Sequence, residues 1–143
     1  MEISELNQYI SECSAPLTQR LESGDLSSSF PECSRVLADR MLKKPAWQIA
    51  LPMVSCLAAG GDLETGSKLA AAWYPMYIAS EILDNVEDNE FTPDRLMPSP
   101  EIATNMATSF IFMAFQALTI IEKPERVSQI TEIFSQLGID ATY

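Results

Sequence analysis

The residues with the clearest chemical potential are the carboxylates between Glu81 and Asp94. This run holds six acidic side chains and no basic one. If the segment is helical, Asp84 and Asp88 stand at positions i and i+4, on one face and one turn apart. Two like charges ~6 Å apart repel by about 0.7 kcal/mol in water, and carboxylates at the carboxyl end of a helix also oppose its dipole. A hard divalent cation such as Mg2+, which takes oxygen ligands and is often shared with substrate phosphates, would offset both penalties.

The acidic run also has a simpler interpretation, as the solvated end of a surface helix. The net charge of −11 argues against a nucleic-acid-binding surface and against attraction to anionic lipid. The 143 residues contain no histidine, which excludes Ser-His-Asp hydrolases and histidine-based zinc sites. Cys13, Cys33 and Cys56 are widely spaced, with no CxxC pair. They favour free or buried thiols in a reducing compartment, so we expect a cytoplasmic location.

The elements that must position these carboxylates are all expected to be helices. With 143 residues, of which 47% are hydrophobic, the chain suffices for one domain with a core. No segment alternates as a strand would, and no internal repeat is visible. The expected fold is therefore an all-α helical bundle in a single domain over 1–143. We expect helices over about 4–17, 31–42, 46–59, 63–88, 100–122 and 125–137, with loops at 22–29 and 89–99.

Glycine, proline and serine mark the ends of these helices. Gly60-Gly61 should end the helix that begins near 46, and Gly138 should end the last one. Ser99 should cap a helix whose first residue is Pro100. Pro75 falls inside the long fourth helix and should bend it.

The most apolar stretch of the chain runs from Met106 to Ile121. It is shorter than a usual membrane span and contains Gln116, so we expect a buried core helix and no transmembrane segment. Its apolar residues lie nearly all round, and such a helix needs neighbours on every side. Only five residues follow Gly138. We therefore expect that the natural chain continues past Tyr143, or that a partner covers this helix.

One face of the long helix that leads to Asp84 carries bulky side chains. Trp73, Met76 and Tyr77 lie on the same side as Ser80 and Asp84 if the helix is regular. Ordinary core packing accounts for such a stripe. The lining of a tunnel for an apolar ligand is the other interpretation, and the sequence leaves both open.

A spaced series of short motifs precedes and includes the acidic run. In chain order these are Leu51-Pro52, Ala58-Ala59-Gly60-Gly61-Asp62, Leu69-Ala70-Ala71-Ala72 and Ala79-Ser80-Glu81-Ile82-Leu83-Asp84-Asn85-Val86-Glu87-Asp88. The series resembles the amino-terminal half of the trans-isoprenyl diphosphate (polyprenyl) synthases. In that family a glycine pair ends one helix, and the next helix leads to the first Asp-Asp-x-x-Asp motif. The resemblance covers roughly residues 30 to 143 and is clearest from 46 to 90.

The resemblance implies a class I isoprenoid synthase fold, a homodimer or a heterodimer with a related synthase, and a Mg2+-dependent prenyltransferase. Such an enzyme joins an allylic diphosphate to isopentenyl diphosphate. On this resemblance Asp84 and Asp88 would bind Mg2+, assisted by Asn85 or Glu87, and the metal would neutralise the leaving diphosphate. The substrate-binding residues that it implies are Arg95, Lys44, Ser80, Tyr77, Met76 and Trp73.

The chain departs from the family pattern in four places. The paired arginines that follow the first motif in the family are reduced to Arg95, displaced by a few residues. The second motif position is Asn85 rather than aspartate, which removes one negative charge from the site. The Gly-Gly-Lys-x-x-Arg-Pro motif is represented by Lys43-Lys44-Pro45, without the bidentate arginine. The second aspartate-rich motif belongs to the carboxy-terminal half of the family domain, which these 143 residues do not include. We therefore expect the chain to be the amino-terminal half of a longer synthase-like domain.

Two other functions fit the same residues. A non-catalytic homologue that dimerises with an active synthase and modulates it would need neither Asn85 as a ligand nor an arginine clamp. A protein that ionises a prenyl diphosphate and cyclises it, as terpene synthases do, would need no isopentenyl diphosphate site. The sequence leaves the product chain length open in each case.

Overall fold

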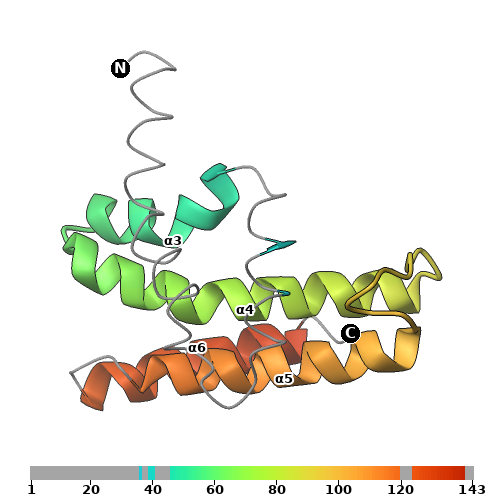
Figure 1. Ribbon diagram of the computed structural model, residues 1–143. Coiled ribbons are helices and arrows are strands. Elements are labelled where there is room, and N and C mark those ends of the chain that lie inside the picture. Colours follow the sequence, from blue (N-terminus) through green and yellow to red (C-terminus); the bar gives the residue numbers. More distant parts are fainter. Residues whose placement is uncertain (1–35, 37–38, 41–45, 120–123, 141–143) are drawn as a thin grey trace.

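Four helices make up most of the described structure (Figure 1). The computed structural model describes residues 36, 39–40, 46–119 and 124–140. The helices are α3 (Ala46–Ala58), α4 (Leu63–Glu87), α5 (Pro100–Leu118) and α6 (Pro124–Asp140). No strand occurs in these ranges, which confirms the all-α expectation for them. The helix expected over 4–17, the loop over 22–29 and most of the helix over 31–42 lie outside the described residues.

The long helix α4 is the centre of the described fold. α5 lies beside it and runs in the opposite direction, while α3 packs on its amino-terminal half (Figure 1). Small side chains are frequent among the buried residues of both α4 and α5. The fully buried alanines are Ala70, Ala71, Ala72 and Ala79 on α4, and Ala103, Ala107 and Ala114 on α5. Pro75 is buried within α4, and the helix continues on both sides of it.

The end of α3 lies where the glycine pair predicts it. Gly60 adopts φ = +82°, a left-handed conformation in which glycine has no steric penalty. The Gly60 N–H donates to the Leu57 carbonyl at 3.0 Å, and the Gly61 N–H donates to the Cys56 carbonyl at 2.9 Å. These two bonds form a Schellman motif, which satisfies carbonyls that the end of a helix leaves without partners.

The end of α4 has the same motif with a different residue in the left-handed position. Asn89 adopts φ = +59°. Its N–H donates to the Val86 carbonyl at 3.3 Å, and the Glu90 N–H donates to the Asn85 carbonyl at 2.9 Å. Asp88 is the C-terminal cap of the helix, so the predicted boundary at this residue is confirmed.

The two later helices end at other residues than predicted. Ser99 does cap α5, because its Oγ accepts the Ile102 N–H at 3.4 Å. The expected extension of α5 to about 122 is wrong, since the helix ends at Leu118 and Thr119 is its C-terminal cap, whose N–H donates to the Gln116 carbonyl at 3.0 Å. The expected end of α6 at Gly138 is also wrong. The helix continues to Asp140, because Gly138 keeps a right-handed helical conformation.

Burial on α5 is one-sided in the described structure. Phe110, Met113 and Leu118 are buried in the core with the alanines of α5, whereas Phe112 is 70% exposed and Ile102 is 42% exposed. The side of α5 that carries Phe112 therefore faces outward. Among the described residues, no helix combines the length and the apolar character needed to cross a membrane.

Candidate functional site

The predicted carboxylate pair lies at the carboxyl end of α4. Asp84 and Asp88 are both exposed. The Asp88 N–H donates to the Asp84 carbonyl at 2.9 Å, so regular α-helical geometry continues through the last turn. With 3.6 residues per turn, the two side chains lie on one face, one turn apart. The spacing inferred from the sequence is therefore present in the fold.

The other two residues predicted as metal ligands lie on the flanks of this pair. Each helical residue adds 100° of rotation, so Glu87 lies about 60° to one side of Asp84 and Asn85 about 100° to the other. Glu87 is exposed, whereas Asn85 is half-buried. Asp88 lies about 40° around the helix from Asp84, and Glu87 and Asn85 lie about 80° to either side of the midpoint between them, so the Asp84–Asp88 pair is the compact part of the predicted set.

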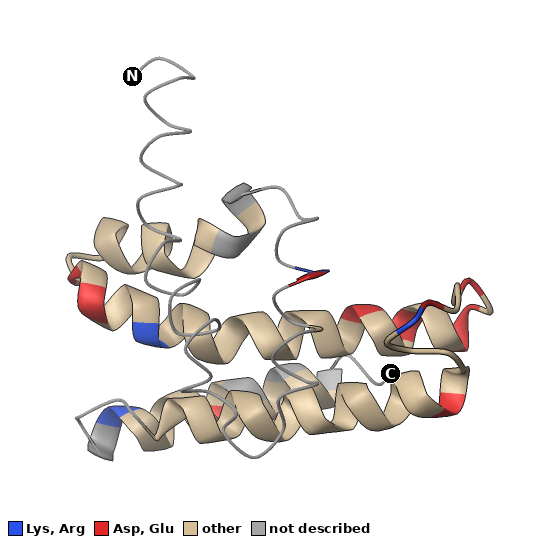
Figure 2. Ribbon diagram, viewed as in Figure 1, with Lys and Arg blue, Asp and Glu red and all other residues tan. Residues whose placement is uncertain are grey.

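Acidic residues gather around this end of the molecule, at the end of α4, the following loop and the start of α5 (Figure 2). The side chains of Asp84, Glu87 and Asp88 have no hydrogen bond or ion pair with the rest of the described chain. No group of three cysteines or carboxylates that could hold a metal ion occurs in the described ranges. Mg2+ is commonly bound by one or two protein carboxylates, several waters and substrate phosphates, so the exposed pair fits that mode of binding.

The bulky stripe below the carboxylates lies between α4 and α3. The Trp73 and Tyr77 rings stack with centroids 6.2 Å apart and an interplanar angle of 21°. The Tyr77 hydroxyl donates to Gln48 Oε1 of α3 at 3.5 Å. Trp73, Met76 and Tyr77 are half-buried and pack against the core. Core packing thus accounts for much of their surface, and the remainder is accessible.

Ser80 lies between this stripe and the carboxylates. Its side chain is exposed, and its hydroxyl donates to the Tyr77 carbonyl at 3.0 Å and to the Met76 carbonyl at 3.2 Å. The hydroxyl therefore bonds to the backbone of its own helix, and its oxygen lone pairs are the groups that remain for a ligand.

Of the two predicted cations, Arg95 lies within the described residues and forms no ion pair with Asp84 or Asp88. Arg95 is exposed in the loop after α4, and Lys44 lies outside the described residues. A different cation, Arg40, reaches this end and forms an ion pair with Asp94, with Nη2 and Oδ2 3.8 Å apart. Asp94 Oδ1 also accepts the N–H groups of Leu96 and Met97, both at 2.8 Å, which orders the loop.

The buried hydroxyl group of Tyr74 on α4 was not predicted from the sequence. Burial raises the pKa of the Tyr74 hydroxyl above its ordinary value, and the nearby Glu81 carboxylate raises it further, while Arg40 opposes the shift. Tyr74 therefore remains a protonated hydrogen-bond donor at neutral pH. The i, i+7 spacing of Tyr74 and Glu81 was a possible signal for their shared face, but the sequence contains none for the approach of Arg40.

Comparisons with known proteins identify no family for the chain. No protein-family model matches the chain, and no match was found among curated proteins or solved structures. The functional argument therefore rests on the residues of α4 and their surroundings.

Proposed function

We propose that the protein is a polyprenyl-synthase-like prenyltransferase that binds an allylic isoprenyl diphosphate together with Mg2+ at the carboxyl end of α4. The observation that carries the proposal is the exposed Asp84–Asp88 pair, which has no partner among the described residues. The pair stands on the same face as Ser80, Tyr77 and the Trp73 ring, so polar and apolar parts of one ligand could both be bound.

The electrostatics of this helix end favour a cation. Asp84 and Asp88 repel each other across one turn, and both lie at the negative end of the α4 dipole. A bound Mg2+ would supply charge neutralisation for the diphosphate and thereby favour breakage of the allylic carbon–oxygen bond. The two carboxylates would hold the ion, Arg95 would contact phosphate oxygens, and the Trp73–Tyr77 stack would contact the prenyl chain.

The location of Asn85 favours a second candidate, a non-catalytic homologue that pairs with an active synthase. Asn85 is half-buried and carries no charge, so it is poorly suited to replace the missing aspartate as a metal ligand. A site with two carboxylates would bind Mg2+ and diphosphate more weakly than the full motif. On this alternative, the protein would contribute its helices to a heterodimer and would form no product alone.

Calorimetric titration with farnesyl diphosphate tests the binding step. We expect binding in the presence of Mg2+, none in the presence of EDTA, and a loss of at least about 100-fold in Asp84→Ala, because a direct ligand is removed. Glu101→Gln is the matched control, since it removes one exposed charge near the start of α5 and should change affinity by less than about twofold. Equal affinity with and without Mg2+, or full affinity in Asp84→Ala, would contradict the proposal.

Product analysis then separates the reactions. A longer prenyl diphosphate formed only with isopentenyl diphosphate would show elongation, and a cyclic hydrocarbon formed without it would show cyclisation. Mg2+-dependent binding without any product, together with co-purification with an active synthase, would favour the non-catalytic alternative.

A further inference from the structure

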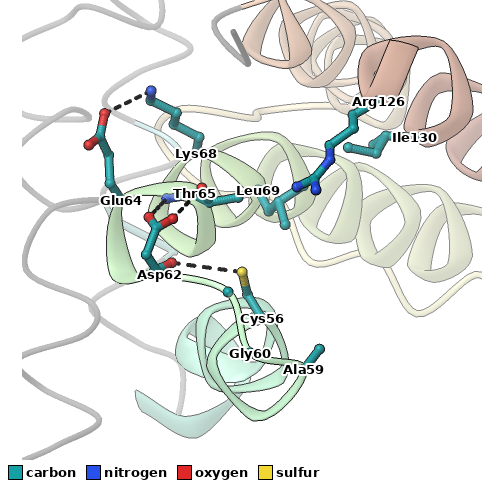
Figure 3. A pocket seen from close by; sticks show the side chains of 11 residues that line it. Cys56, Ala59, Gly60, Asp62, Glu64, Thr65, Lys68, Leu69, Arg126 and Ile130 are labelled. Carbon is teal, nitrogen blue, oxygen red and sulfur yellow. Dashed lines mark hydrogen bonds and ion pairs between the residues drawn. The ribbon is translucent and has the colours of Figure 1, made fainter. Parts of the chain in front are cut away.

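A separate hollow lies at the opposite end of α4 (Figure 3). Its volume is about 720 Å3, and it is bounded by the turn after α3, the first two turns of α4 and the start of α6. At 1.5 Å per residue, the rise along α4 from Thr65 to Asp84 is ~28 Å, so the hollow is distinct from the carboxylate pair. Its volume is within the range of pockets that bind small molecules, roughly 300–1,000 Å3.

The charged residues around the hollow differ in whether their side chains already form hydrogen bonds or ion pairs. Lys68 Nζ lies 2.8 Å from Glu64 Oε1. Asp62 Oδ1 accepts the Thr65 N–H at 2.8 Å, and Oδ2 accepts the Thr65 hydroxyl at 3.1 Å. Arg126 of α6 is exposed, and within the described ranges it forms neither an ion pair nor a hydrogen bond. The guanidinium is therefore the charged group that remains for a ligand.

Aliphatic surface adjoins this guanidinium. Leu69 of α4 and Ile130 of α6 line the hollow, and both are half-buried against the core. Figure 3 shows the Arg126 side chain extending from α6 toward Leu69, while Lys68 turns away toward Glu64. A single available cation thus lies beside two branched apolar side chains, an arrangement that suits a ligand with one charged end and one apolar end.

We propose that this hollow binds an aliphatic monocarboxylate, with its carboxylate on Arg126 and its chain along Leu69 and Ile130. The planar guanidinium matches a carboxylate with two parallel hydrogen bonds. Asp62 and Glu64 also border the hollow, so a dianion such as a phosphate monoester would be repelled more strongly than a monoanion. The inference uses no residue of the Asp84–Asp88 pair and is independent of the proposed prenyl diphosphate site.

Calorimetry with octanoate, below its micelle concentration, tests the ligand class. We expect octanoate to bind the full chain, Arg126→Gln to weaken binding by at least about tenfold, and Arg126→Lys to give an intermediate loss because the fork is replaced by a point charge. Arg40→Gln is the matched control, since it removes the same charge from a residue that pairs with Asp94, away from the hollow, and should leave the affinity for octanoate unchanged. Equal binding in Arg126→Gln, equal binding of 1-octanol, or tighter binding of octyl phosphate would overturn the proposal.

The reaction rate of the Cys56 thiol tests independently whether octanoate binds in this hollow. It lines the hollow and is free, with its Sγ 3.8 Å from the Asp62 carbonyl. In a chain with Cys13→Ser and Cys33→Ser, saturating octanoate should slow the reaction of Cys56 with N-ethylmaleimide. Arg126→Gln should abolish this protection, while circular dichroism shows that the variant keeps its helical fold. An unchanged reaction rate at saturating octanoate would overturn the location.

Discussion

The two ends of α4 use the same residue class in opposite ways. At the amino end, Asp62 caps the helix and Glu64 pairs with Lys68, so both carboxylates stabilise the fold at the positive end of the dipole. At the carboxyl end, Asp84 and Asp88 lie at the negative end and have no side-chain partner in the described structure. Acidic residues that oppose the dipole without a structural role are better candidates for ligand binding than those that cap or pair.

Packing differs between the two ends as well. α3 lies close against the first turns of α4, where a Cβ on Gly66 would come within 3.1 Å of the Met53 Cα. Beyond Tyr77, which bonds to Gln48 near the start of α3, the same face of α4 carries exposed Ser80 and Asp84. The contact between α3 and α4 is thus close at the amino end of α4, whereas exposed polar residues at its carboxyl end form the proposed diphosphate site.

Gly66→Val should have the largest effect, because it separates the helices at the packed end. The added side chain would meet the backbone of Met53, which cannot move without shifting α3. We expect the free energy of unfolding to fall by about 2–3 kcal/mol, measured by urea titration. Gly138→Ala is the control, since its Cβ meets nothing within 4 Å, and it should raise the free energy of unfolding by about 0.5–1 kcal/mol. Equal stability of Gly66→Val and the wild type would contradict close packing at this end.

Removing the Asp62 cap should have the next largest effect and should depend on pH. The Thr65 N–H hydrogen bond, aided by the Thr65 hydroxyl, lowers the pKa of Asp62 below its ordinary value of 3.8. The folded state therefore favours the ionised form, and its contribution is fully present above the unfolded-state pKa. The stability difference between wild type and Asp62→Ala should shrink as the pH falls through the folded-state pKa.

Asp62→Asn is the matched control for this titration. Asparagine caps helices about as well as aspartate but does not ionise in this range, so it should preserve most of the stability. Its stability relative to Asp62→Ala should not follow the titration of a carboxylate at this position. A wild-type advantage over Asp62→Ala that stays constant throughout acid titration would show that the charge of Asp62 does not contribute.

Local signals in the sequence predicted the helix boundaries well where one residue determines the conformation. Gly60 ends α3 because its positive φ favours glycine, and Ser99 caps α5 because its hydroxyl accepts the Ile102 N–H. Gly138 misled the prediction, because a glycine also fits inside a helix at a cost of about 1 kcal/mol. Asn89 was assigned to a loop, and its left-handed conformation after α4 was not predicted.

The sequence predicted only those features of the candidate site that depend on residues close together in the chain. The helical period placed Asp84 and Asp88 on one face, and the structure shows them there. The Arg40–Asp94 ion pair and the influence of Arg40 on Tyr74 depend on how distant segments pack. No spacing rule predicts such contacts.

The left-handed residues after α3 and α4 should differ in their response to substitution. Gly60→Ala should lower the free energy of unfolding by about 1 kcal/mol, because φ = +82° is unfavourable for a residue with a Cβ. Asn89→Gly should raise it by about 0.5 kcal/mol, because glycine removes the residual strain at φ = +59°. Thermal unfolding of both variants measures the contrast. A loss of stability in Asn89→Gly would show that the asparagine side chain itself stabilises the end of α4.

Removing charges at the two ends of α4 should change the free energy of unfolding in opposite directions. These changes should be smaller than those of the substitutions above. Without Mg2+, the double variant Asp84→Asn, Asp88→Asn should raise the free energy of unfolding by about 0.5 kcal/mol, since it relieves mutual repulsion and an unfavourable dipole interaction. Glu64→Gln should lower it by about 0.3 kcal/mol, since it removes the pair with Lys68. Added salt should reduce both changes.

Adding Mg2+ and farnesyl diphosphate to these variants tests whether the Asp84–Asp88 pair binds the ligand. A ligand that binds the folded state raises stability by RT ln(1 + [L]/Kd), so the melting temperature of the wild type should rise with ligand concentration. Glu64→Gln should show the same rise, because its substitution is remote from the pair. The double variant should begin more stable and gain nothing. If it instead gains as much as the wild type, the carboxylates at the end of α4 do not bind the ligand, and their repulsion is only a cost to the fold.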